Sequence, residues 1–198
     1  MTLVMLITVI LGSFFGYYFV PQSSINTVET ISTVALNLLI LFVGIDVGSN
    51  KNLVSDIKEN GIKLILIPIS IAVGSIIGGI VASFICSMSL KSGISISAGF
   101  GWYSLSAVML TNLENAEIGT IAFLTNVFRE ITALLIIPFV ARKLNHYTAI
   151  APAGATSMDT TLPVISKSTS PKVTIAAFIS GVMLSSFVPV IISFLYAI

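Results

Sequence analysis

Long uncharged stretches dominate this sequence and leave few folds open to it. An apolar helix needs about 20 residues to cross a bilayer, and the chain has 56% hydrophobic and 9% charged residues with a mean hydropathy of +1.06. We therefore predict an all-α integral membrane protein. The uncharged stretches are residues 2–20, 31–45, 64–90, 92–113, 118–128 continued as 131–141, 147–158 and 173–198.

No segment is polar enough to form a separate soluble domain, so residues 1–198 are expected to form a single transmembrane domain. The first stretch is long enough to span the membrane and lacks the positively charged start of a signal peptide, which predicts a retained helix. The net charge of +1 argues against nucleic acid as a partner.

Two of the stretches differ from ordinary spans. SGISISAGFGWYSLSAVMLTNL, residues 92–113, contains three glycines, and AIAPAGATSMDTTLPVISK, residues 149–167, contains two prolines and a glycine around Asp159. Proline and glycine disturb regular helix hydrogen bonding, and non-helical backbone at membrane depth persists only against protein or a water-filled cavity. Both segments are predicted to be broken helices or re-entrant hairpins.

The basic residues favour one of two topologies, because lysine and arginine in short loops gather on the cytoplasmic side. If both broken segments are re-entrant, about five full spans remain, with seven basic residues inside and only Lys91 outside. If all seven stretches cross fully, the split is five against three. We prefer the first scheme, with the N-terminus inside and the C-terminus outside. The seven inside residues are Lys51, Lys58, Lys63, Arg142, Lys143, Lys167 and Lys172.

In the preferred scheme the first hairpin enters from outside and the second from the cytoplasm, so their tips approach each other near the middle of the membrane. Opposed broken segments built from inverted repeats form the binding sites of many secondary transporters. No internal sequence identity marks a repeat in this chain. Inverted repeats are therefore a structural hypothesis.

Acidic residues within spans need an explanation, because an ionised group at the bilayer centre costs roughly 2.5–3.5 kcal/mol. Asp46 ends the second stretch and is expected at the interface. Glu130 lies about 16–18 Å from either end of its helix at 1.5 Å per residue, which favours a functional role. It shares a helix face with Asn126, whereas Arg129 points about 100° away. Arg129 has two equally supported interpretations: its guanidinium bonds to the carbonyls of a broken helix, or it has a functional role.

Asp159 is the expected second member of a site with Glu130. Thr156 and Thr160 offer hydroxyls beside it, and the flanking prolines leave carbonyls free to bind a cation. Two carboxylates would desolvate an ammonium group at lower cost than hydrocarbon does. A proton that replaced this ligand on one carboxylate would provide exchange transport.

The segment GFGWYSLS, residues 99–106, places an aromatic pair beside flexible backbone. Trp102 and Tyr103 are predicted to form a wall over a bound cation, with Ser104 as a further ligand; membership of an interfacial aromatic belt is the alternative. Gly74 and Gly78 have the small-xxx-small spacing that lets helices approach closely. They are expected to serve packing.

These segments resemble the LysO-type membrane lysine exporters. The resemblance is carried by GFGWYSLSAVMLT, by GTIAFLTNVFREITALLIIPFVARKL and by AIAPAGATSMDTTLPVISK with the helix after it, over roughly residues 93–198; LLILFVGIDVGSN resembles an earlier helix of the family. It implies export of L-lysine, and of basic analogues such as thialysine, across the inner membrane of a prokaryote. It also implies that Glu130 in FRE and Asp159 in MDTT are essential.

Members of that family commonly carry an N-terminal portion of several helices that this chain lacks. The resemblance therefore implies a short membrane subunit that supplies this portion, or assembly of the chain with itself as a homodimer. Protons and the lipid bilayer are the other expected partners. No cofactor or metal site is expected.

Other classes of function have less support. A serine-type intramembrane protease needs a general base near its nucleophile, but the sole histidine, His146, is expected in a loop facing water, away from Ser104. Asp46 and Asp159 lack the glycine-flanked setting of an aspartyl protease, so no enzyme activity is predicted. A structural membrane subunit, or a transporter of another small cation or amino acid, is the alternative. The single cysteine, Cys86, is expected to pack in the core.

Overall fold

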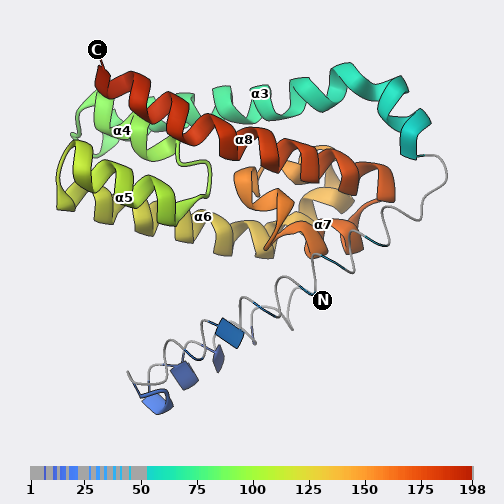
Figure 1. The fold of residues 1–198 in the computed structure, drawn as a ribbon, viewed down its shortest axis with the longest axis horizontal. Helices are drawn as coiled ribbons and strands as arrows, with labels where there is room; N and C mark the ends of the chain where they lie inside the picture. Colours follow the sequence, from blue (N-terminus) through green and yellow to red (C-terminus); the bar gives the residue numbers. More distant parts are fainter. Residues whose placement is uncertain are drawn as a thin grey trace.

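The structure is a computed structural model that describes residues 53–197 and scattered positions between residues 7 and 45. Asp46 and most of the first two predicted spans lie outside the described residues. Within residues 53–197 the chain is entirely helical (Figure 1). The elements are α3 (Leu53–Ile85), α4 (Leu90–Ser97), α5 (Tyr103–Leu113), α6 (Ala116–Lys143), the 3₁₀ turns η2 (Thr148–Ile150) and η3 (Gly154–Met158), α7 (Leu162–Ser168) and α8 (Pro171–Ala197).

Three long helices, α3, α6 and α8, frame the described part of the molecule. Each contains an apolar stretch of 22 to 28 residues, enough to cross a bilayer, and large apolar side chains such as Ile69, Phe128 and Phe194 cover their outer surfaces. These helices correspond to three of the predicted full spans. The total of five depends on stretches outside the described residues. The apolar stretches are Leu64–Ile85, Ala116–Lys143 and Pro171–Ala197.

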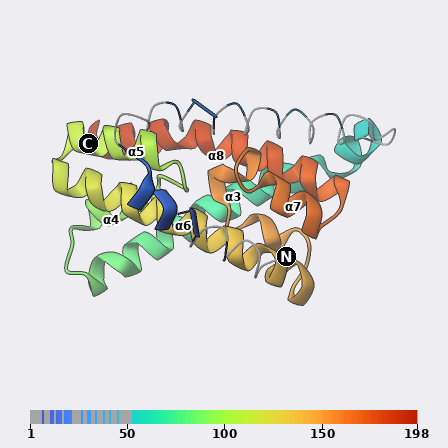
Figure 2. The same ribbon diagram turned by 90° about the horizontal axis from the view of Figure 1, so that it is seen from below.

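The stretch 92–113 turns back on itself. It breaks at residues 98–102 into α4 and α5, which run in opposite directions (Figures 1 and 2). The two ends of this first hairpin lie together, because the Ser92 hydroxyl donates a hydrogen bond to Oε1 of Glu114 at 2.6 Å. A continuous helix of this length would place them about 33 Å apart. The predicted break of this segment into a hairpin is confirmed, and its re-entrant path in the membrane stays a prediction.

The second broken segment forms a hairpin from the opposite end of the molecule. It leaves the C-terminal end of α6, passes through η2 and η3, turns after Met158 and returns along α7 to the start of α8 (Figure 1). Pro163 lies in the first turn of α7, where a missing N–H leaves no helical hydrogen bond unmade. The two opposed broken segments are as predicted, while an inverted repeat stays a prediction.

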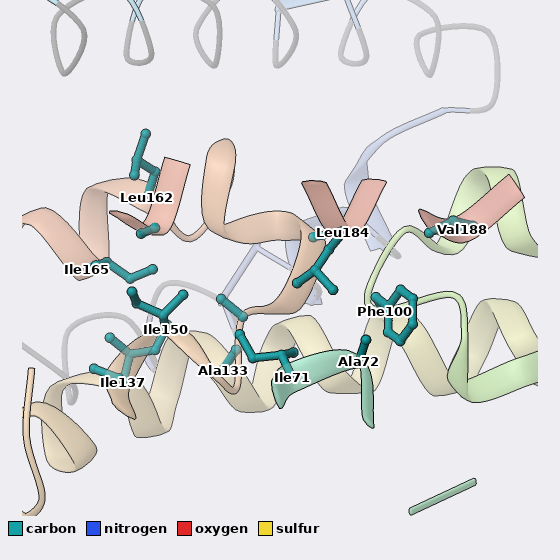
Figure 3. Close-up of a cluster of buried hydrophobic side chains, with 14 of the residues drawn as sticks. Ile71, Ala72, Phe100, Ala133, Ile137, Ile150, Leu162, Ile165, Leu184 and Val188 are labelled. Carbon is teal, nitrogen blue, oxygen red and sulfur yellow. The ribbon is translucent and has the colours of Figure 1, made fainter. Parts of the chain in front are cut away.

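The hydrophobic core lies between the three long helices and includes both hairpins. Phe100 from the first hairpin, Ile150 from the second and Leu184 from α8 are completely buried there (Figure 3). Close packing of the hairpins against the long helices therefore stabilises their irregular backbone at the centre of the molecule.

Among the described residues two packing predictions are not met, one on α3 and one just beyond its end. Gly74 and Gly78 are exposed, with no described atom within 4 Å of a Cβ built on either. The close approach to α4 occurs instead at Gly79, where a Cβ would lie 2.6 Å from the carbonyl oxygen of Gly93. Cys86, just beyond the end of α3, is exposed and not in the core. The spacing of small residues in the sequence did not identify the face of α3 that meets α4.

Candidate functional site

The tips of the two hairpins touch near the middle of the molecule. The backbone N–H of Ala155 in η3 donates to the carbonyl oxygen of Phe100 at 2.8 Å. Left-handed backbone shapes both tips, with φ of 48° at Phe100, 103° at Gly101 and 62° at Gly154. A Cβ at Gly154 would clash with the Phe100 carbonyl oxygen and lie 3.0 Å from Nη2 of Arg129. Glycine at this position therefore permits the contact between the tips.

Asn126 on α6 holds the first tip in place. Its side chain is 2% exposed, and its Oδ1 accepts a hydrogen bond from the N–H of Gly101 at 2.7 Å. Its Nδ2 donates to the carbonyls of Ile96 at 3.2 Å and Ala122 at 2.9 Å. The sequence predicts Asn126 as a ligand, but in the structure its amide bonds to backbone and it does not line the cavity described next.

A cavity of about 200 Å³ lies where the two tips meet α6 and α8. Among the described residues, the side chains that line it include two carboxylates and no lysine or arginine, so the cavity is electronegative. Nine residues were predicted from the sequence to bind the substrate or protons, and seven of them line this cavity. Those seven are Trp102, Tyr103, Ser104, Glu130, Thr156, Asp159 and Thr160. We call this space the carboxylate cavity.

Glu130 and Asp159 enter the carboxylate cavity from different elements, the middle of α6 and the end of η3. Thr160 lines the cavity with them: its hydroxyl lies 3.4 Å from Oδ1 of Asp159, and its backbone N–H donates to the same oxygen at 2.6 Å. Two half-buried carboxyl groups this close repel each other when both are ionised. A bound cation or a proton relieves that repulsion.

Trp102 and Tyr103 form a wall of the carboxylate cavity. Tyr103 is close enough to interact electrostatically with both Glu130 and Asp159, and its ring packs edge-on against Phe123 with 5.4 Å between centroids. Aromatic rings beside carboxylates suit an ammonium group, which is attracted by both.

Arg129 lies outside the carboxylate cavity, as its rotation of about 100° from Glu130 requires. Its Nε donates to the carbonyl of Pro152 at 3.2 Å and its Nη2 to that of Ala151 at 3.3 Å. Its Nη1 donates to the hydroxyl of Ser75 on α3 at 2.9 Å. Arg129 thus ties the second hairpin to two long helices, which is the predicted bonding to carbonyls of a broken segment.

The remaining lining residues were not singled out from the sequence. Gly101, Ala155 and Met158 lie in the broken segments, but they carry no functional group that marks a ligand. Ser185 lies in α8, which reads as an uninterrupted apolar helix. A weak signal was present: Gly181 precedes Ser185 by one helical turn, and a Cβ at Gly181 would lie 2.5 Å from the backbone nitrogen of Met158.

Ser104 lines the carboxylate cavity without a histidine among the described lining residues. His146 is exposed, as predicted, and is absent from the residues that line the cavity with Ser104. A hydroxyl without a general base is a weak nucleophile.

Comparison with known sequences identifies the family. The sequence profile described as "Lysine exporter LysO" matches residues 6–196. The chain belongs to the lysine exporter LysO family. The Escherichia coli protein named "Lysine exporter LysO" is 36% identical over 166 residues, which are 84% of this chain and 55% of that protein. A Haemophilus influenzae protein named "Putative lysine exporter" is 39% identical over 158 residues, which are 79% of each chain.

No solved structure matches the chain. The LysO match confirms the resemblance predicted from the broken segments, and it includes both hairpins and every residue of the carboxylate cavity. Family and apolar helices together make the chain a multi-pass membrane protein. The chain spans about half the length of the Escherichia coli LysO protein that it matches.

Proposed function

We propose that this chain exports L-lysine, together with close basic analogues such as thialysine, across the cytoplasmic membrane of a prokaryote. Its membership of the LysO family and the names of its relatives support lysine as the substrate. The observation that carries the proposal is that Glu130 and Asp159 share one cavity at the junction of two opposed hairpins. Carboxylates at membrane depth mark pathways for substrates, ions or protons.

In the proposed mechanism, Glu130 and Asp159 together receive the side-chain ammonium group of lysine. Trp102 and Tyr103 cover it, while Thr160 and the other hydroxyls of the cavity accept its remaining hydrogen bonds. Protons then replace the lysine on the carboxylates and return them to neutrality, so that lysine leaves as protons enter. The carboxylates bind either a substrate or protons, which makes the chain an antiporter.

Access from the two sides would alternate through the hairpin tips. The first hairpin leads toward the outside and the second toward the cytoplasm if the N-terminus lies inside, as the basic residues predict. The tips meet through one backbone hydrogen bond between Ala155 and Phe100. A small separation of the tips would open the cavity to one side, as in other transporters built from opposed broken helices.

The decisive experiment is lysine counterflow in liposomes with Glu130→Gln and Asp159→Asn. Each substitution keeps the size and hydrogen-bonding capacity of its side chain but removes the charge, so we expect flux to fall at least tenfold while the protein still inserts. Glu117→Gln is the matched control, since Glu117 is an exposed acid in the first turn of the same helix. Normal flux in both cavity variants would refute the proposal.

Proton coupling requires a separate measurement. Liposomes that contain a pH-sensitive dye and an imposed lysine gradient should show proton movement opposite to lysine, and Asp159→Asn should abolish it. If lysine moves without protons, proton antiport is refuted, while the carboxylates can still form the lysine-binding site.

The protein partner is also a proposal. We infer that the active form contains either a further short membrane subunit or a second copy of this chain. Counterflow by the purified chain alone, compared with the chain co-purified with such a subunit, distinguishes these two assemblies. Cross-linking through Cys86, which is exposed, tests the homodimer directly.

A further inference from the structure

A second cavity lies on the other side of the hairpin tips, between α3, α4 and α6. Its volume is about 260 Å³, far above the roughly 10–15 Å³ of probe-occupied space that a single water needs. Arg129 lines it, together with Asn126 and several small residues, and it reaches Cys86 beyond the end of α3. The helical rise from Ser75 to Cys86, both of which line the cavity, is about 16 Å. We call this space the arginine cavity.

Its charge is opposite to that of the carboxylate cavity. Arg129 is its only charged residue among the described side chains that line it. No described carboxylate is bonded to the guanidinium, whose partners are two carbonyls and one hydroxyl. A permanent positive charge at membrane depth is costly without a counter-charge.

Arg129 and its neighbours retain hydrogen-bond donors for such a counter-charge. A guanidinium has five N–H donors, and three are used by Pro152, Ala151 and Ser75, which leaves two. The Ser75 hydroxyl accepts from Arg129 and so keeps its own proton to donate. Other serines of the cavity, Ser83 and Ser97, donate theirs to helix carbonyls. The free donors therefore gather at the Arg129 end.

We propose that the arginine cavity binds a small monovalent anion at Arg129 and Ser75. The anion is either the α-carboxylate of the transported amino acid or a free inorganic anion such as chloride, since both offer one negative charge and several acceptor positions. Only the carboxylate source rests on the proposed function; the anion site itself stands on Arg129 and its cavity. The site lies directly behind Gly154, whose added Cβ would lie 3.0 Å from Nη2 of Arg129.

The glycines of α3 provide a matched pair of variants for the test. Gly78 lines the arginine cavity and has no described atom within 4 Å of an added Cβ, so Gly78→Leu is chosen to place an apolar side chain at the cavity. Gly74, one helical turn earlier, also has open space but does not line the cavity, so Gly74→Leu is the control. Arg129→Gln removes the charge itself, although it also removes hydrogen bonds that hold the second hairpin.

The measurement is thermal unfolding of the purified full chain in sodium chloride or sodium acetate, against sodium gluconate at the same ionic strength. At ten times its dissociation constant a ligand should raise the melting temperature by about 3–6 °C. We expect this rise in the native chain and in Gly74→Leu, and its loss in Gly78→Leu and Arg129→Gln. No rise in the native chain, or an equal rise in Gly78→Leu, would overturn the site.

Comparison of lysine with cadaverine, which is lysine without its carboxylate, identifies the source of the anion. Greater protection by lysine than by cadaverine, lost in Gly78→Leu, assigns the site to the substrate carboxylate. Equal protection by the two amines, combined with protection by chloride, assigns it to a free anion. A chain that exports lysine yet shows no anion-dependent protection would refute the anion site and leave the proposed function intact.

Discussion

Replacement of Asn126 by leucine tests whether the first hairpin tip is held as the structure indicates. Leucine has a similar size but makes no hydrogen bonds, so the N–H of Gly101, bonded to Asn126 at 2.7 Å, loses its partner. A buried donor left without a partner costs about 1–3 kcal/mol, and measured hydrogen bonds between membrane helices average about 0.6 and reach about 1.7 kcal/mol. We therefore expect a loss of stability of about 1–2 kcal/mol.

For a chain of this size that loss lowers the melting temperature by about 2–8 °C, which circular dichroism in detergent resolves. Asn112→Leu is the control, because it makes the same change at an exposed position of α5 and adds the same apolar surface. Lysine counterflow should fall in Asn126→Leu as well, since Gly101 also lines the carboxylate cavity. An unchanged melting temperature relative to Asn112→Leu would refute the role of Asn126.

Four further results are expected. Gly154→Ala should lower stability by about 2 kcal/mol, from its positive φ and its clash with the facing carbonyl, whereas Gly74→Ala in open space should not; equal melting curves would contradict this. Arg129→Lys should melt below the native chain, because one ammonium group does not reach acceptors on both the second hairpin and α3; an unchanged melting temperature would contradict it. Cys86 is exposed beside the entry of the first hairpin, so a membrane-impermeant maleimide should label it from outside; labelling only after permeabilisation would invert the topology. Trp102, the single tryptophan, lines the carboxylate cavity, so lysine should change its fluorescence and glutamate should not; a response to both, or to neither, would contradict the placement of the site.

The carboxylate cavity could be predicted because the membrane makes its residues conspicuous. Glu130 lies near the middle of a long apolar helix, where an ionised group is costly, so its position in the sequence already indicated a functional residue. Asp159 was predicted for a second reason: prolines and a glycine around it rule out a regular helix at membrane depth. The same argument found both broken segments.

Other features depend on which faces meet in three dimensions, and the sequence does not specify these. Gly74, Gly78 and Gly79 are equally small, and only the structure shows that Gly79 meets α4. Asn126 is polar and shares a face with Glu130, which predicts a ligand, but its amide is satisfied by backbone groups of the first hairpin. Spacing along one helix predicted which residues share a face, but not whether that face meets a cavity or a hairpin.

The adjacent charges of α6 acquire a common explanation from the geometry of the tips. Neighbouring residues on a helix point about 100° apart, so Arg129 and Glu130 lie on two sides of the point where the hairpins meet. Arg129 bonds to the carbonyls behind the second tip, and Glu130 faces the cavity in front of it. One turn of helix thereby gives the tip contact a positive side and a negative side. Lysine has the complementary polarity, with an anionic carboxylate at one end and a cationic side-chain ammonium group at the other.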